Sequence, residues 1–213
     1  MKRRFNHWSP RYLTARIQNF LFLKRYPDKP WLTPDAIEFL DQWLRKADHG
    51  AEFGSGRSTI WFAKRVSTLL SVENNPDWYN KVKQWLQDEN CDHVDYLLAG
   101  ENENESDLIR ASKYVNPAIE LPEESLDFAV VDGRWRSQCA NALICKLKPG
   151  GLLIIDNANL YLPSNSHSPN SQSIDQGPAT ETWRIFWEST TKWRRFWTSN
   201  GVFDTALFFK PGR

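Results

Sequence analysis

Two closely spaced glycines after a short apolar strand constrain this chain more than any other feature. Gly54 and Gly56 follow a predicted strand over residues 51–53, and a predicted helix follows over residues 58–66. The next predicted strand, residues 68–72, ends at Glu73. In an open α/β sheet such glycines let the backbone approach a ligand, and an acid after the second strand accepts hydrogen bonds from ribose hydroxyls. The pattern predicts a nucleoside-binding crevice.

Two kinds of nucleoside ligand fit this crevice, a dinucleotide or S-adenosylmethionine. The dinucleotide fingerprint places a third small residue three positions after the second glycine, where this chain has Thr59. Glu52 precedes the first glycine by two residues, and its charge would repel a pyrophosphate but suits a ligand with an amino group and a sulfonium. These residues favour the methyl donor.

Composition limits the classes of protein that the chain can belong to. Its 213 residues are enough for one domain, and its net charge of +1 gives no global attraction to nucleic acid, so we expect no nucleic-acid partner. Three cysteines without metal-type spacing fit a reducing, cytoplasmic location. No apolar run approaches the roughly 20 residues needed to span a bilayer, so we expect no stable membrane insertion. Exposed tryptophans would allow a homodimer.

Residues 1–48 are predicted to form a helical cap. Tyr12, Ile17 and Phe20 recur at helical spacing among basic residues, and Thr33-Pro34 resembles the start of a second helix. A basic amphipathic helix of this kind can lie on a membrane. We favour the alternative that it packs on the following domain as a cover.

Residues 49–213 alternate between strand and helix patterns. Further strands are predicted over residues 94–98, 126–131 and 152–155, and helices from Pro76 and over residues 138–147, whereas residues 101–122 are poorly defined. A helix over 180–189 precedes two strands, residues 192–197 and 203–209, joined by an Asn-Gly turn. This order predicts an α/β fold, a single Rossmann-like, doubly wound, mostly parallel sheet of about seven strands that ends in an antiparallel hairpin.

The segment 159–178 is rich in Ser, Asn and Pro and lacks periodicity. It leaves the strand that ends near Ile155, at the edge where such sheets bind ligands. It is predicted to be a flexible lid over the crevice or an inert loop.

Together, the glycine motif, Glu73 and the terminal hairpin resemble the class I S-adenosylmethionine-dependent methyltransferases, over about residues 50–210. The resemblance implies an enzyme of methyl transfer. It also implies a set of cofactor-binding residues, namely Glu52, Gly54, Ser55, Gly56, Ser58, Glu73, Asn74 and Asp132.

A second set of motifs is similar to the small-molecule O-methyltransferases of the catechol and caffeoyl-CoA type. Asp132 follows one predicted strand, and Asp156 and Asn157 follow the next. The resemblance implies that these three side chains hold Mg²⁺ or another divalent cation, a role that suits a set of oxygen ligands. The alternative is that Asp132 contacts cofactor or substrate while Asp156 caps a turn.

The chain departs from these relatives beside Asp132. They carry a lysine three residues after the first acid, where this chain has Trp135 between Arg134 and Arg136. Either arginine could orient an anionic acceptor. The candidate catalytic residues are Asp132, Asp156 and Arg134. The predicted reaction is O-methylation of a small molecule, assisted by a metal. A nicotinamide-dependent oxidoreductase and a non-catalytic binding protein with this fold remain open as alternatives.

Overall fold

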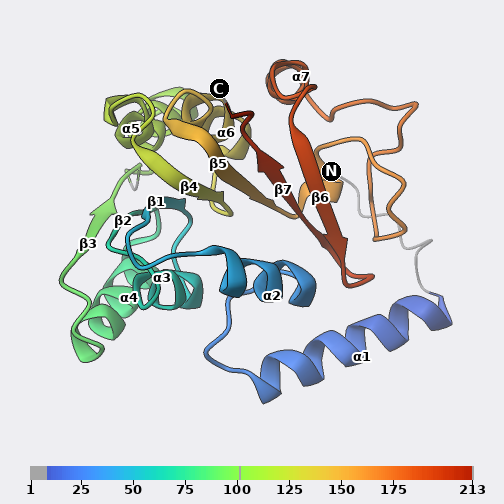
Figure 1. The fold of residues 1–213 in the computed structure, drawn as a ribbon, viewed down its shortest axis with the longest axis horizontal. Helices are drawn as coiled ribbons and strands as arrows, with labels where there is room; N and C mark the ends of the chain where they lie inside the picture. Colours follow the sequence, from blue (N-terminus) through green and yellow to red (C-terminus); the bar gives the residue numbers. More distant parts are fainter. Residues whose placement is uncertain (1–8, 101, 213) are drawn as a thin grey trace.

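The computed structural model describes residues 9–100 and 102–212 and shows one seven-stranded sheet between two layers of helices (Figure 1). The strand order is β3-β2-β1-β4-β5-β7-β6. The strands are β1 (His49–Phe53), β2 (Thr68–Glu73), β3 (Val94–Leu98), β4 (Leu126–Val131), β5 (Leu147–Asp156), β6 (Arg194–Ser199) and β7 (Asp204–Phe209).

The sheet confirms the fold class predicted from the sequence. Strands β1 to β5 pair in parallel, whereas β7 runs antiparallel to both β5 and β6. The chain moves outward from β1 in both directions, to β2 on one side and to β4 on the other. Ligands of doubly wound sheets bind at this switch point, outside the carboxyl ends of the strands.

Two groups of helices cover the two faces of the sheet. Helices α5, α6 and α7 share one buried cluster with the sheet, and α2, α3 and α4 share the other (Figure 1). The helices are α1 (Pro10–Arg25), α2 (Pro34–Trp43), α3 (Arg57–Ala63), α4 (Pro76–Asp88), α5 (Asp107–Glu120), α6 (Arg136–Leu143), the short 3₁₀ helix η1 (Ala158–Leu160) and α7 (Glu181–Ser189).

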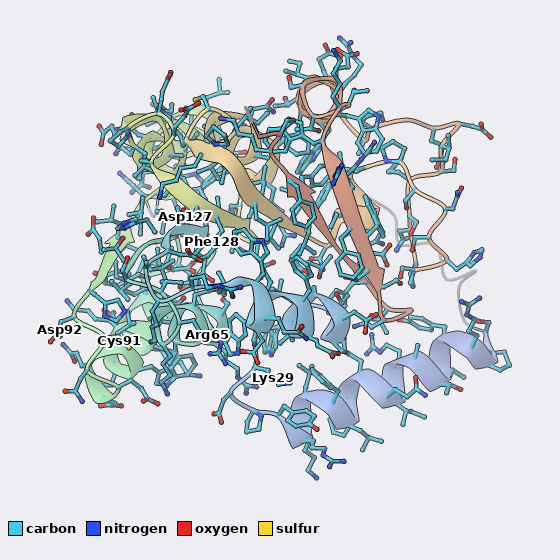
Figure 2. The ribbon with its side chains drawn as sticks, viewed as in Figure 1. Lys29, Arg65, Cys91, Asp92, Asp127 and Phe128 are labelled. Atoms are coloured by element: carbon cyan, nitrogen blue, oxygen red, sulfur yellow. The ribbon has the colours of Figure 1, made fainter. Side chains whose placement is uncertain are left out.

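The central strands are packed on both faces. Phe128 of β4 is fully buried, and its ring lies 5.2 Å from that of Phe62 on α3 (Figure 2). A Cβ atom on Gly50 of the neighbouring strand would lie only 2.1 Å from the Phe128 ring. Glycine at that position therefore lets the large ring lie across β1 in the centre of the molecule.

Two elements differ from the sequence prediction. Residues 107–120, within the stretch that showed no clear pattern, form α5, which buries Tyr114 and Val115 although it contains Pro117. The predicted helix over 138–147 ends at Leu143, because β5 already begins at Leu147 and pairs there with Leu126 of β4. The Pro-Gly-Gly stretch thus lies within an irregular strand.

The predicted cap consists of two helices that pack differently. Helix α2 buries Ala36, Ile37 and Leu40, whereas Ala15 is the buried residue of α1. The cover that we expected is therefore provided by α2, whereas α1 leaves four large apolar side chains exposed, namely Leu13, Ile17, Phe20 and Leu21. Within the described ranges, no helix is long and apolar enough to cross a membrane.

The loop 159–178 packs along the terminal hairpin (Figure 1). Ser168, which is buried, donates a hydrogen bond of 2.6 Å to Asp204, whose backbone N–H donates to Asn159 over 3.1 Å. A cavity of about 760 Å³ lies between this loop, the start of α1 and β6. A lid function of the loop stays a prediction.

Candidate functional site

The loop after β1 is held against the loop after β4 by two glycines. Gly54 adopts φ +103°, a conformation that favours glycine, and a Cβ atom there would lie 2.3 Å from the backbone nitrogen of Gly133. A Cβ atom on Gly133 would in turn lie 2.1 Å from the hydroxyl oxygen of Tyr114. The loops at the carboxyl ends of β1 and β4 are therefore in close backbone contact, at the edge of the sheet where the ligand is predicted to bind.

Glu52 of β1 lies beneath this loop and is fully buried. Its Oε2 atom accepts hydrogen bonds from the Thr59 hydroxyl at 2.6 Å and the Ser71 hydroxyl at 3.0 Å. Its Oε1 atom is buried without a hydrogen-bond partner among the described residues. A buried carboxylate oxygen without a donor is unfavourable, so a hydrogen-bond donor brought by a ligand would stabilise this atom.

Burial raises the pKa of Glu52 from 4.5 to about 7, against the lowering effect of the nearby Ser58, Thr59 and Ser71 side chains. The negative charge of Asp132 adds to the rise. The residue therefore titrates near neutral pH. A cationic ligand group at Oε1 would favour the ionised form.

Thr59 has a role that the sequence did not suggest. Its hydroxyl accepts a hydrogen bond of 2.9 Å from the Gly56 N–H while donating to Glu52. The residue that departs from the dinucleotide fingerprint thus connects the glycine loop to the buried acid. Ser71 lies opposite Glu52 in the parallel pairing of β1 and β2 and supplies the other donor.

The second glycine, Gly56, is buried, but a Cβ atom would fit at its position. A Cβ atom on Gly56 would meet its nearest neighbour, the Trp78 ring, at 3.8 Å, an ordinary van der Waals distance. The backbone at Gly56 is extended, with φ 170°. Neither packing nor backbone conformation requires glycine at this position.

Glu73, at the end of β2, is buried and accepts four hydrogen bonds. Its Oε1 atom accepts from the backbone N–H groups of Asn74 and Asn75 at 2.9 and 2.8 Å. Its Oε2 atom accepts from the N–H and the hydroxyl of Ser55 at 3.1 and 2.9 Å. A carboxylate can accept about four hydrogen bonds, so the acceptor capacity of Glu73 is already filled. A ribose hydroxyl would therefore have to displace the Ser55 hydroxyl.

Aromatic side chains that sequence reasoning left out of the cofactor set surround the glycine loop. The Trp78 indole donates to the Ser55 carbonyl at 2.8 Å, and the Tyr96 hydroxyl lies 2.7 Å from the Ser55 hydroxyl. On the other side, Trp135 packs its ring against the position of Gly100, which follows β3. Glu101, the nearest acid after this strand in sequence, lies outside the described residues.

Asp132 and Asp156 come together at the ends of β4 and β5, as predicted. Burial is the main cause that raises the pKa of Asp132, and the Arg136 guanidinium opposes it. Burial and then the charge of Asp132 raise the pKa of Asp156 well above its usual range. Asp132 keeps 31% of its side chain exposed, whereas Asp156 is buried and accepts from the Thr205 hydroxyl at 2.9 Å. Asp132 is thus the more accessible of the two carboxylates.

Arg136 bridges the residues that were predicted to hold a metal. Its guanidinium donates to the Asp132 carboxylate at 2.8 Å and to the Asn157 amide oxygen at 3.2 Å. It also donates to the backbone carbonyls of Asp132, Gly133 and Asp156. A positively charged side chain therefore cross-links the ends of the two strands.

These contacts do not fit a divalent cation on the predicted set. Arg136 takes up oxygens of Asp132 and Asn157, and its positive charge would repel a metal placed between them. Within the residues that the structure describes, no group of three or more His, Cys, Asp or Glu side chains could hold a metal ion. We therefore assign no step of the reaction to a metal.

Arg134 lies between β4 and α6, two residues after Asp132. It is exposed, and its guanidinium lies 5.0 Å from the centre of the Trp135 ring. It is free to meet an acceptor, unlike Arg136, which is 14% exposed and engaged by the strand ends. An orienting role of Arg134 stays a prediction.

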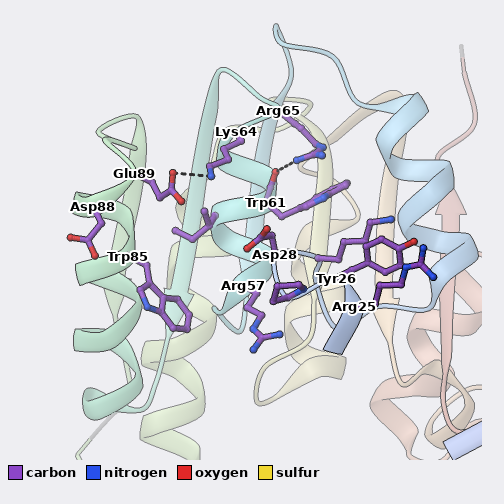
Figure 3. A pocket seen from close by; sticks show the side chains of 13 residues that line it. Arg25, Tyr26, Asp28, Arg57, Trp61, Lys64, Arg65, Trp85, Asp88 and Glu89 are labelled. Atoms are coloured by element: carbon purple, nitrogen blue, oxygen red, sulfur yellow. Dashed lines mark hydrogen bonds and ion pairs between the residues drawn. The ribbon is translucent and has the colours of Figure 1, made fainter. Parts of the chain in front are cut away.

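A groove of about 590 Å³ lies between α3, α4 and the segment that joins α1 to α2 (Figure 3). Its charges are partly paired, since Lys64 contacts Glu89 at 2.8 Å and Arg65 contacts Asp41 at 2.8 Å. It contains none of the predicted cofactor residues. The groove is therefore not part of the candidate site.

Comparisons with known proteins show the fold. No protein-family model and no curated protein matches the chain. A methyltransferase-like protein from Silicibacter pomeroyi is 18% identical, with a TM-score of 0.61 over 87% of this chain and 89% of that chain. An rRNA methylase from Streptococcus thermophilus is 12% identical, with a TM-score of 0.54 over 87% and 100%.

A third similar structure is that of M. jannaschii TYW2 in complex with AdoMet. It is 13% identical, with a TM-score of 0.50 over 85% of this chain and 77% of that chain. At such low identities the likeness shows that this chain has the fold of these methyltransferases.

Proposed function

We propose that this protein is a class I S-adenosylmethionine-dependent methyltransferase. The observation that carries the proposal is the buried Oε1 atom of Glu52, which lies beneath the glycine loop without a donor. The amino group of S-adenosylmethionine would supply both the missing donor and the compensating charge. A pyrophosphate at the same place would add a negative charge beside a buried carboxylate, so the chemistry of the site disfavours a dinucleotide.

The other cofactor residues would act on the nucleoside. Gly56 would let its backbone approach the ligand, and Glu73 would bind the ribose in place of the Ser55 hydroxyl. Trp135, beside the end of β3, would offer an aromatic surface to the adenine. Replacement of Trp135 by leucine is expected to weaken binding of the product S-adenosylhomocysteine by about tenfold, as stacking of about 1–3 kcal/mol per base implies. Unchanged affinity by calorimetry would remove Trp135 from the site.

The reaction would be methylation of a hydroxyl group on a small molecule. S-adenosylmethionine supplies an activated methyl group on a sulfonium. Asp132, the exposed member of the carboxylate pair, would hold the acceptor hydroxyl in line with that methyl group and take its proton as the new oxygen–carbon bond forms. Arg134 would bind an acidic part of the acceptor. Asp156 and Arg136 would hold Asp132 in place.

The expectation that the protein has no nucleic-acid partner finds no support in the comparisons, because one similar structure is an rRNA methylase. The acceptor screen should therefore contain RNA as well as hydroxylated small molecules. Transfer of a labelled methyl group from S-adenosylmethionine to any of these acceptors, lost on replacement of Asp132 by alanine, would support the proposal. Transfer that persists undiminished in this variant would refute the role of Asp132.

A further inference from the structure

Helix α1 lies at the periphery of the molecule (Figure 1). It presents a stripe of exposed apolar side chains to solvent. Leu13, Ile17, Phe20 and Leu21 are 44, 60, 64 and 55% exposed. At about 100° per residue these four positions lie on one side of the helix. A cluster of large apolar side chains on a single exposed face marks an interaction surface.

The opposite side of α1 attaches the helix to the protein. Ala15 is buried against the turn of the terminal hairpin, close to Gly201, and Asn19 accepts a hydrogen bond of 3.1 Å from Asn200. Phe22, about one helical turn after Asn19, packs against the buried cluster that α2, α3 and α4 share with the sheet. The helix is thus fixed with its apolar stripe pointing away from the body of the protein.

All charged side chains of α1 are basic. The helix contains Arg11, Arg16, Lys24 and Arg25 and no acidic residue. At about 100° per residue, Arg16 and Arg25 border the stripe on its two sides, and Lys24 extends it. The sequence before the helix adds Lys2, Arg3 and Arg4, which lie outside the described residues.

We propose that α1 binds the surface of an anionic lipid bilayer. An apolar stripe bordered by cations is the arrangement of helices that lie in the plane of a membrane interface, with the apolar side chains between the headgroups and the cations near lipid phosphates. A second copy of the chain fits this surface less well, because a two-fold interface would place the basic helix against itself. The helix attaches the protein to the membrane surface without crossing the bilayer.

Vesicle flotation of the full chain tests the proposal. The protein is expected to float with phosphatidylcholine vesicles that contain phosphatidylglycerol, to remain unbound with phosphatidylcholine alone, and to be released at high salt. The double variant Ile17→Ser/Phe20→Ser should bind at least about tenfold more weakly, because it removes the largest apolar groups from the interface. The variant Arg16→Gln/Lys24→Gln should lose about fivefold for each cation.

The matched control is Leu108→Ser/Ile109→Ser on α5, which removes apolar side chains that are 84 and 49% exposed on another surface. It should bind vesicles as the unaltered protein does, and thermal unfolding should show that every variant is folded. Absence of binding to the anionic vesicles would overturn the proposal, as would an equal loss in the α5 control. Self-association in sedimentation experiments that is lost in Ile17→Ser/Phe20→Ser, without vesicle binding, would assign the stripe to a second copy of the chain.

Discussion

Replacement of Glu52 by glutamine separates the function of this residue from its effect on stability. The substitution keeps the size of the side chain and an oxygen that can accept from Thr59 and Ser71. It removes the negative charge that is buried beneath the glycine loop. We expect the variant to be more stable than the unaltered protein in the absence of ligand and to bind S-adenosylhomocysteine more weakly.

The gain in stability follows from the pKa of Glu52, which burial raises from 4.5 to about 7. Because the pKa is higher in the folded state, the stability that Glu52 contributes is present below about pH 4.5 and is lost as the pH rises through about 7. At about pH 8 the ionised side chain costs on the order of 3 kcal/mol. The amide of the glutamine would leave an unpaired donor that costs about 1 kcal/mol. The free energy of unfolding should therefore rise by about 2 kcal/mol.

Ligand affinity should change in the opposite direction. A hydrogen bond to a charged group contributes about 1.5–3 kcal/mol, so the variant should bind S-adenosylhomocysteine about ten- to a hundredfold more weakly at about pH 8. In the unaltered protein, affinity should fall as the pH decreases below about 7, because Glu52 must then release a proton to accept the ligand ammonium group. The heat of binding should depend on the ionisation enthalpy of the buffer for the same reason.

Urea unfolding and calorimetry at about pH 8 and about pH 5.5 measure both effects, and the stability gain should shrink at the lower pH. Glu38→Gln, an exposed carboxylate on α2, is the matched control and should change neither quantity. If Glu52→Gln destabilised the protein at both pH values, the buried charge would be favourable and the reasoning wrong. Unchanged affinity would show that the ligand does not contact Glu52.

Further variants test the loop and the strand ends. Gly54→Ala should prevent folding or destabilise the protein by several kcal/mol, on the order of the overpacking cost and the cost of a positive φ angle together. Gly56→Ala should leave thermal unfolding unchanged and weaken binding of S-adenosylhomocysteine. Equal effects of the two substitutions on stability would contradict the description of the loop. Ser55→Ala should bind S-adenosylhomocysteine as tightly as the unaltered protein or up to about fivefold more tightly, because it removes the hydroxyl that competes for Glu73. A large loss of affinity in calorimetry would show that the hydroxyl itself binds the ligand. Arg136→Met should lower the free energy of unfolding, measured in urea, by about 3–5 kcal/mol because it breaks the mostly buried ion pair with Asp132. An unchanged free energy of unfolding would mean that the link between the ends of β4 and β5 does not stabilise the protein.

The sequence predicted the sheet well where strands are short apolar runs. The strands at residues 94–98 and 126–131 were predicted with their observed bounds. For residues 126–131 the reason is that a buried parallel strand produces an apolar run between turn signals. Helix α5 was missed because Pro117 and a polar, acidic beginning obscure its periodicity, and its formation depends on packing of Tyr114 against the sheet.

The candidate site was predictable only in part, for a related reason. Glu52, the glycines and Glu73 are recognisable from local spacing along one βα unit. The donors from Ser71 and Thr59 depend on strand register and on the turn geometry of the loop, neither of which spacing defines. The bridge from Arg136 to Asn157 depends on how the ends of β4 and β5 are placed, so the sequence suggested a metal where the structure has a guanidinium.

The most direct test of the proposed function is calorimetric titration of the purified protein with S-adenosylhomocysteine, with NADH as the control ligand. We expect micromolar binding of S-adenosylhomocysteine, accompanied by proton release from Glu52 near neutral pH, and no binding of NADH. Absence of S-adenosylhomocysteine binding, or tighter binding of NADH, would contradict the methyltransferase proposal.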